Sequence, residues 1–243
     1  MVAANGVRDL AYGNDLPGGY SERMLLSAPL LQVVPNGLDP RLAALTEPMA
    51  VGLHAVNRSG VGPGDGAVVL GCGPVGLAVI AALGLRGIDT IVASDPSPTR
   101  RSLATTMGAS TVVNPNALDV WAAWAADGGT RPLVAFEAIG RPGILDEVLR
   151  LVPAHSRVVV VGVCMEQDRI TPFFGIAKEL QLQFVLAYDL VEFADSLRAI
   201  AEGDIDVAPL VTGEVGLDGV PGAFDDLADP ERHCKVLVVP SLA

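Results

Sequence analysis

The chain has 243 residues, which is enough for one large domain or two smaller ones with a sizeable core. Half of the residues are hydrophobic but only 5% are aromatic, a balance that suits a parallel sheet covered by helices. The 16 Lys and Arg residues against 28 Asp and Glu residues give a net charge of −12, which argues against nucleic acid or an anionic membrane as a partner.

Cysteine usage and the first residues restrict the class of protein further. Cys72, Cys164 and Cys234 lie far apart and form no CxxC pair, so neither a disulfide framework nor a cysteine zinc cluster is indicated. The opening residues, MVAANGVRDL, lack the apolar core of a secretory signal peptide. We therefore expect a cytoplasmic protein.

The first 60 residues predict a small β region followed by helices. Residues 1–19 are rich in Gly, Asn and Pro and are expected to form a loop. Residues 21–27 and 30–34 are expected to be strands. A longer helix then begins with Thr46 as its candidate N-cap and ends at Gly60.

The next stretch carries the most informative motif of the chain. A buried strand at residues 68–70 is followed by Gly71, Gly73 and Gly76 in G-x-G-x-x-G spacing and by an apolar helical segment. A second strand then ends near Asp95, 19 positions after the last of these glycines. Glycines between a strand and a helix, with a carboxylate at the end of the next strand, predict a dinucleotide-binding unit.

Each glycine has a separate expected role in that unit. Gly71 permits the tight turn, Gly73 lets a pyrophosphate approach the backbone, and Gly76 lets the helix pack on the sheet. Pro74 suits the start of the helix, and the first helical turn, which includes Val75, offers unpaired N–H groups and a positive dipole end to a phosphate.

The residues around the second strand predict the type of cofactor. Asp95 would accept hydrogen bonds from the adenosine ribose and repel a 2′-phosphate, so NAD is favoured over NADP. Arg100 and Arg101 lie close enough to leave NADP as the less favoured alternative. Cys72 is expected to offer its backbone to the pyrophosphate and to carry an inert thiol.

The uncharged run at residues 67–85 is also nearly long enough to cross a membrane. Its glycines interrupt it, and Pro74 divides it into a strand-sized and a helix-sized piece. We therefore interpret it as a buried βα unit.

Alternating strands and helices continue to about residue 190 and predict a doubly wound parallel sheet of about six strands. Trp121 and Trp124 are expected to be packing residues. The remaining strands are expected at 111–113, 133–136, 157–163 and 183–187, and the helices at 98–107, 117–126, 143–151 and 176–180. After residue 190 we expect a helix at 191–202, a strand at 205–211, a helix at 220–227 and a strand at 235–239.

Several segments together resemble the medium-chain dehydrogenase/reductase family, in its zinc-dependent alcohol, polyol and threonine dehydrogenase branch. They are GGYSERMLLS, LTEPMAVGLHAV, GVGPGDGAVVLGCGPVGLAV, FEAIGRPG, RVVVVGV and KVLVVP. The resemblance implies an α/β fold in which a Rossmann sheet is joined by a partial GroES-like β domain built from both chain ends. The implied division is a catalytic-domain remnant at 1–50, an NAD-binding domain at 51–190 and a C-terminal return at 191–243.

The resemblance also implies a catalytic zinc, bound in the family mainly by an early cysteine and a His-Glu pair. This sequence contains neither the Gly-His-Glu motif nor an early cysteine. Glu47 matches a late carboxylate of the zinc site in polyol-type members, and carboxylate oxygen is an ordinary zinc ligand. The alternative is a first-turn glutamate that complements the helix dipole. His54 is expected to pack or hydrogen-bond rather than bind metal.

Further contacts are implied by the same resemblance. Ala138, Ile139, Gly162 and Val163 would line the nicotinamide side of the cofactor, or they would simply form βα turns. Relatives commonly dimerise through the edge strand of the nucleotide domain, here about residues 181–187, so a homodimer is expected.

Three hypotheses for function follow. The first is an NAD-dependent oxidoreductase that interconverts a small alcohol or polyol and its carbonyl compound by hydride transfer. The second is a dinucleotide-binding remnant without dehydrogenase activity. The third is that the sequence begins within a longer, ordinary enzyme of this type.

Overall fold

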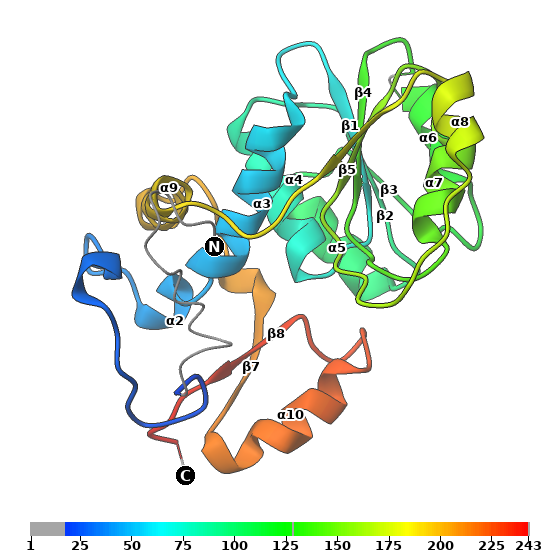
Figure 1. The fold of residues 1–243 in the computed structure, drawn as a ribbon. Coiled ribbons are helices and arrows are strands. Elements are labelled where there is room, and N and C mark those ends of the chain that lie inside the picture. The colour runs from blue at the N-terminus through cyan, green and yellow to red at the C-terminus, as the bar shows by residue number, and fades with distance from the viewer. Residues whose placement is uncertain (1–17, 128, 243) are drawn as a thin grey trace.

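A computed structural model describes residues 18–127 and 129–242 of the chain. Its centre is one six-stranded parallel sheet in the order β3-β2-β1-β4-β5-β6 (Figure 1). This order reverses between β1 and β4, as in doubly wound dinucleotide-binding sheets, so the predicted fold class is confirmed. The strands are β1 (Gly66–Leu70), β2 (Ile91–Ser94), β3 (Thr111–Val113), β4 (Leu133–Glu137), β5 (Arg157–Val160) and β6 (Gln181–Phe184).

Helices cover both faces of this sheet (Figure 1). One face carries α3 (Thr46–Ser59), α4 (Pro74–Leu85) and α5 (Pro98–Thr106), and the other carries α6 (Val120–Asp127), α7 (Ile144–Leu151) and α8 (Pro172–Ala177). All five residues of β1 are buried because each face of this central strand is covered. Ala67 and Val69 pack with α4, whereas Val68 and Leu70 pack against Trp124 and the opposite core.

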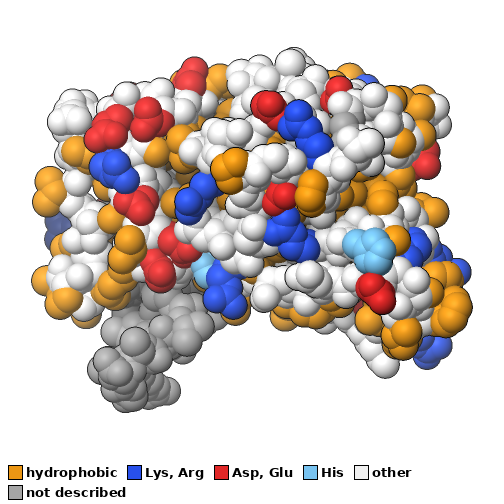
Figure 2. Space-filling model, turned by 90° about the horizontal axis from the view of Figure 1, so that it is seen from above, with side chains coloured by type: hydrophobic (Ala, Val, Ile, Leu, Met, Phe, Trp, Pro, Cys, Tyr) orange, Lys and Arg blue, Asp and Glu red, His pale blue; other side chains and the backbone are white. Residues whose placement is uncertain are grey.

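The uncharged run at 67–85 is a strand followed by a helix, as predicted. Within the described part of the chain, no helix combines the length and the apolar character that a membrane crossing requires. Acidic and basic side chains are interspersed over the face seen in Figure 2, so the negative net charge is not gathered into one patch there.

The C-terminal part leaves the sheet and meets the N-terminal segment. The helix α9 (Leu190–Glu202) packs on α3, and β7 (Val211–Val215) pairs with β8 (Lys235–Val238) in a separate parallel sheet, with α10 (Val220–Leu227) beside it. Arg41, in the short helix α2 (Pro40–Ala43), forms an ion pair with Glu214 at 2.5 Å. The rings of Tyr20 and Phe224 also meet, with centroids 6.1 Å apart.

The strands predicted at 21–27 and 30–34 are wrong. The described residues before α2 contain no strand and form only a 3₁₀ turn at Ala28–Leu30. The apolar pattern suggested strands, but Leu25 and Val33 are 79% and 90% exposed and no neighbouring strand offers them hydrogen bonds. Most of the predicted N-terminal loop, residues 1–17, lies outside the described residues.

Other predicted elements exist with shifted boundaries. The strand expected at 205–211 begins at Val211, because Pro209 and its neighbours form a 3₁₀ turn first. The strand expected to reach Val163 ends at Val160, and the elements predicted at 176–180 and 183–187 lie earlier, as α8 and β6. Thr46 is the first residue of α3 rather than its N-cap, and its hydroxyl donates to the Ala43 carbonyl. The predicted end of this helix at Gly60 is confirmed by a left-handed φ of +65°.

Candidate functional site

The β1–α4 turn contains three glycines that are required for different reasons. Gly71 has a φ of +90°, which favours glycine at the turn off the strand. A Cβ on Gly76 would lie 1.9 Å from the carbonyl oxygen of Gly71, so only glycine allows this approach between helix and strand. Gly73 has ordinary extended backbone, and a Cβ there would meet no atom within 4 Å. The space beside Gly73 is therefore open.

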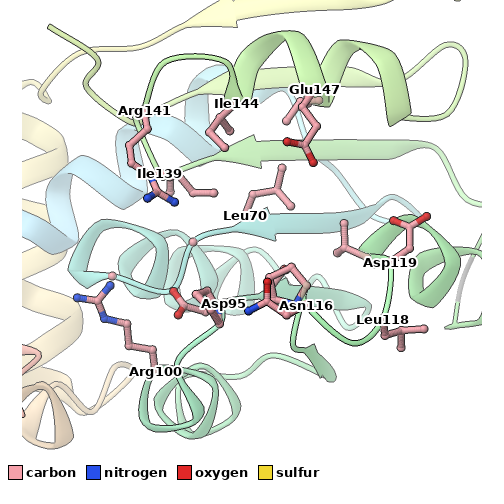
Figure 3. A pocket seen from close by; sticks show the side chains of 18 of the residues that line it. Leu70, Asp95, Arg100, Asn116, Leu118, Asp119, Ile139, Arg141, Ile144 and Glu147 are labelled. Atoms are coloured by element: carbon pink, nitrogen blue, oxygen red, sulfur yellow. The ribbon is translucent and has the colours of Figure 1, made fainter. Parts of the chain in front are cut away.

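A cavity of about 830 Å³ lies over the carboxyl ends of β1, β2 and β4, where the strand order reverses (Figure 3). In open α/β sheets this crevice is the usual place for a ligand. Six of the residues predicted from the sequence line this one cavity. They are Gly71, Gly73, Asp95, Arg100, Ala138 and Ile139.

The other predicted residues lie outside that lining. Pro74, Val75 and Gly76 form the first turn of α4, directly behind the glycine turn. Gly162 packs tightly on Gly140 of the neighbouring loop, where a Cβ on Gly162 would be 2.3 Å from the Gly140 nitrogen. Val163 is 67% exposed beyond this contact.

Asp95 is only 4% exposed, and both carboxylate oxygens accept backbone hydrogen bonds. Oδ2 accepts from the Cys72 N–H at 2.8 Å and Oδ1 accepts from the Ser97 N–H at 2.8 Å. Asp95 therefore ties the glycine turn to the start of α5. Each oxygen keeps a lone pair for a further donor from the cavity.

The two arginines after Asp95 have different roles. The Arg101 guanidinium donates to the carbonyl oxygens of Asp95 and Pro96, at 2.7 and 2.8 Å, and so holds the turn after β2. The Arg100 guanidinium extends toward the cavity beside Asp95 (Figure 3), and its buried Nε has no hydrogen-bond partner. Of these two residues, only Arg100 lines the cavity.

Cys72 is occupied by structural contacts. Its N–H donates to Asp95, and the contact of its backbone with a pyrophosphate stays a prediction. Burial, with a smaller contribution from Asp95, raises the pKa of the Cys72 thiol to about 12. The thiol therefore stays protonated at neutral pH, in keeping with the expected inert role.

Four residues with charged or amide side chains line the cavity that the sequence analysis did not select: Asn116, Asp119, Arg141 and Glu147. Figure 3 shows Arg141 and Arg100 toward one side of the cavity and Asp119 and Glu147 toward the other. Arg141 follows Gly140 directly in the loop after β4, so its position at the carboxyl end of a strand was an available signal. The other three depend on how α6 and α7 pack.

Glu47 lies in the first turn of α3, exposed and outside the cavity. Surrounding protein atoms remove part of the water around its carboxyl and raise its pKa, an effect that the charge of Lys235 opposes. Among residues 18–127 and 129–242, no three His, Cys, Asp or Glu side chains gather as a metal ion would need. His54 instead places Nδ1 2.7 Å from Oε2 of Glu192 in α9, confirming its expected hydrogen-bonding role.

Comparisons with known proteins show the family of the chain. A family model described as zinc-binding dehydrogenase matches residues 74–202, more than half of the chain. The (R,R)-butanediol dehydrogenase of Bacillus subtilis (strain 168) is 34% identical over 225 residues, which cover 92% of this chain and 65% of that protein.

Solved structures agree with this match. L-Idonate 5-dehydrogenase from Escherichia coli K-12 superposes with a TM-score of 0.76 at 30% identity, over 85% of this chain and 59% of that one. A protein from Sinorhizobium meliloti 1021, described as a zinc-binding dehydrogenase and bound to NADP, gives 0.74 at 31% identity, over 85% and 61%. The chain thus spans less than two thirds of the length of these relatives. It belongs to the zinc-binding dehydrogenase family.

Proposed function

We propose that this chain binds NAD and forms part of an oxidoreductase that interconverts a small alcohol or polyol and its carbonyl compound. One observation carries the proposal: the cavity at the reversal of strand order has open space at Gly73 and a buried carboxylate, Asp95, in its wall. Relatives named as butanediol and sorbitol dehydrogenases support the reaction class.

The residues present fit a dinucleotide. Bound NAD supplies a nicotinamide ring that accepts or returns a hydride. Gly73 leaves room for a pyrophosphate beside the first turn of α4, whose Val75 and following N–H groups favour an anion. The free lone pairs of Asp95 accept from ribose hydroxyls. Ala138 and Ile139 are proposed for the nicotinamide side, together with Gly162 and Val163.

The choice of NAD over NADP rests on Asp95, because a buried carboxylate at the end of β2 disfavours a 2′-phosphate. The relative from Sinorhizobium meliloti, bound to NADP, supports a nicotinamide cofactor in general. Arg100 is the residue through which NADP would be accommodated as the less favoured cofactor.

The described residues do not fit a catalytic zinc. Glu47 offers a single carboxylate, and the described part of the chain gathers no group of three or more His, Cys, Asp or Glu side chains that could hold a metal ion. We therefore derive no catalytic step through zinc. The second candidate function is a dinucleotide-binding chain without dehydrogenase activity of its own.

We further propose a homodimer formed through β6. This strand is at the edge of the sheet, and Phe184 and the following Leu186 are 61% and 70% exposed. The division into 1–50, 51–190 and 191–243, and the GroES-like character of the chain ends, stay predictions.

Titration calorimetry with NAD tests the cofactor proposal. Gly73→Val adds a side chain where the backbone is relaxed and the space is empty, so we expect the protein to fold and NAD binding to be lost. Gly62→Val is the matched control, because Gly62 precedes the opposite end of β1 and also has open space. Equal NAD affinity in both variants contradicts the proposal.

A measurement of activity tests the second candidate function. Alcohol-dependent formation of NADH by the 243-residue chain, with one equivalent of zinc bound, would contradict it.

A further inference from the structure

A segment from the C-terminal part forms one wall of the cofactor cavity. Ala228 and Pro230, after α10, line the cavity although they lie far along the chain from the glycine turn. The next residue, Glu231, places Oε2 2.5 Å from the Thr99 hydroxyl, which donates to it, and 3.4 Å from the Thr99 backbone nitrogen. The segment is thereby fastened to the first turn of α5.

The first turn of α5 begins at Pro98, three residues after Asp95. In dinucleotide-binding sheets, the carboxylate at the end of the second strand bonds the ribose 2′-hydroxyl, and a basic residue nearby accommodates a 2′-phosphate. Here Thr99 and Arg100 follow Asp95 by four and five positions, at a helix end whose dipole and N–H groups favour an anion. The buried Nε of Arg100 has no hydrogen-bond partner.

The anion that occupies this helix end is the carboxylate of Glu231. The hydroxyl groups of Ser97 and Thr99 hold the pKa of Glu231 below its usual range, so its charge is present at neutral pH. A 2′-phosphate carries about two further negative charges at this pH and needs the same kind of donors. Both anions cannot use the Thr99 donors at once.

We propose that Glu231 is a specificity-determining residue that excludes NADP. Its carboxylate takes the donors that a 2′-phosphate would need, and its charge, added to that of Asp95, repels such a phosphate. NAD ends in a ribose hydroxyl at this position and needs only Asp95. This inference rests on the proposed NAD-binding function of the cavity.

The test compares NAD and NADP affinities by titration calorimetry at fixed ionic strength, in the full chain and two variants. Glu231→Ala removes the charge and frees the Thr99 donors, whereas Glu231→Gln removes only the charge. We expect the affinity for NADP to rise about tenfold or more in Glu231→Ala, and less in Glu231→Gln. The affinity for NAD should change far less in both. Glu202→Gln is the control for the loss of one negative charge, because the Glu202 side chain is exposed at the end of α9.

A second comparison isolates the freed donor. Thr99→Val in the Glu231→Ala background removes the hydroxyl and should reverse part of the gain for NADP, while NAD affinity again changes little. Thermal unfolding of each variant verifies that the segment after α10 stays folded.

The possible results distinguish a failure of this inference from a failure of the proposed NAD-binding function. Normal NAD binding with no gain for NADP in either Glu231 variant overturns the inference alone. Equal gains for NAD and NADP also overturn it, because Glu231 would then be a general barrier to the cavity. Failure of the unaltered chain to bind either dinucleotide overturns both the inference and the proposed function.

Discussion

Gly76 shows how tightly a single residue can be constrained by the fold. Its backbone lies so near the end of β1 that an added Cβ would be 1.9 Å from the Gly71 carbonyl oxygen. Gly76→Ala should therefore force α4 away from the strand and reduce the free energy of unfolding by about 1–3 kcal/mol. Denaturant unfolding measures this change. A parallel NAD titration should show weaker binding, because the glycine turn shifts with the helix.

Gly84 is the matched control in the same helix. A Cβ at Gly84 would meet no atom within 4 Å, and alanine is the better helix former by about 0.5–1 kcal/mol. Gly84→Ala should leave stability unchanged or increase it. Equal destabilisation by both substitutions would show that the close contact with the Gly71 carbonyl oxygen is not the reason for a glycine at position 76.

The helix α9 packs on α3, and one buried carboxylate, that of Glu192, adds hydrogen bonds to this contact. Glu192 completes a capping box with Asp189 and also accepts from Asn57 of α3, beside the contact with His54. Glu192→Ala leaves these partners without an acceptor and should lower the free energy of unfolding by about 2–4 kcal/mol. Thermal or denaturant unfolding measures the loss.

Glu202, at the other end of α9, provides the comparison. It is exposed and lies 3.9 Å from Arg198, so Glu202→Ala should cost less than about 0.5 kcal/mol. Similar losses in the two variants would mean that the buried contacts of Glu192 add nothing beyond those of a surface glutamate.

At the scale of the whole molecule, β6 is one of the two edge strands of the six-stranded sheet, and it carries the exposed side chain of Phe184. If two copies pair there, Phe184→Lys places charges in the contact and should shift the protein from dimer to monomer. Sedimentation velocity measures the change in mass. Leu25→Lys changes a residue that is also exposed, at 79%, but belongs to the N-terminal segment, and should leave the dimer intact. A monomeric unaltered protein, or a dimer in Phe184→Lys, contradicts the proposal.

Local sequence pattern was sufficient to predict the β1–α4–β2 unit at the centre of the parallel sheet. The strand at 68–70, the glycine spacing and Asp95 all lie within 30 residues, and turn geometry, helix dipole and burial act over such short separations. The same reasoning failed at residues 21–34, because a strand forms only where a partner supplies hydrogen bonds, and none of the described segments does so there.

The sequence by itself determined the βα alternation, the dinucleotide motif and the residues at the ends of the first two strands, because these depend on near neighbours in the chain. Only the tertiary structure decided which distant segments close the cavity. Arg141 and Glu147 reach it from beyond β4, and Glu231 meets Thr99 across 132 positions. Such contacts depend on strand order and on the return of the C-terminal part. The local periodicity of the sequence indicates neither the strand order nor this return.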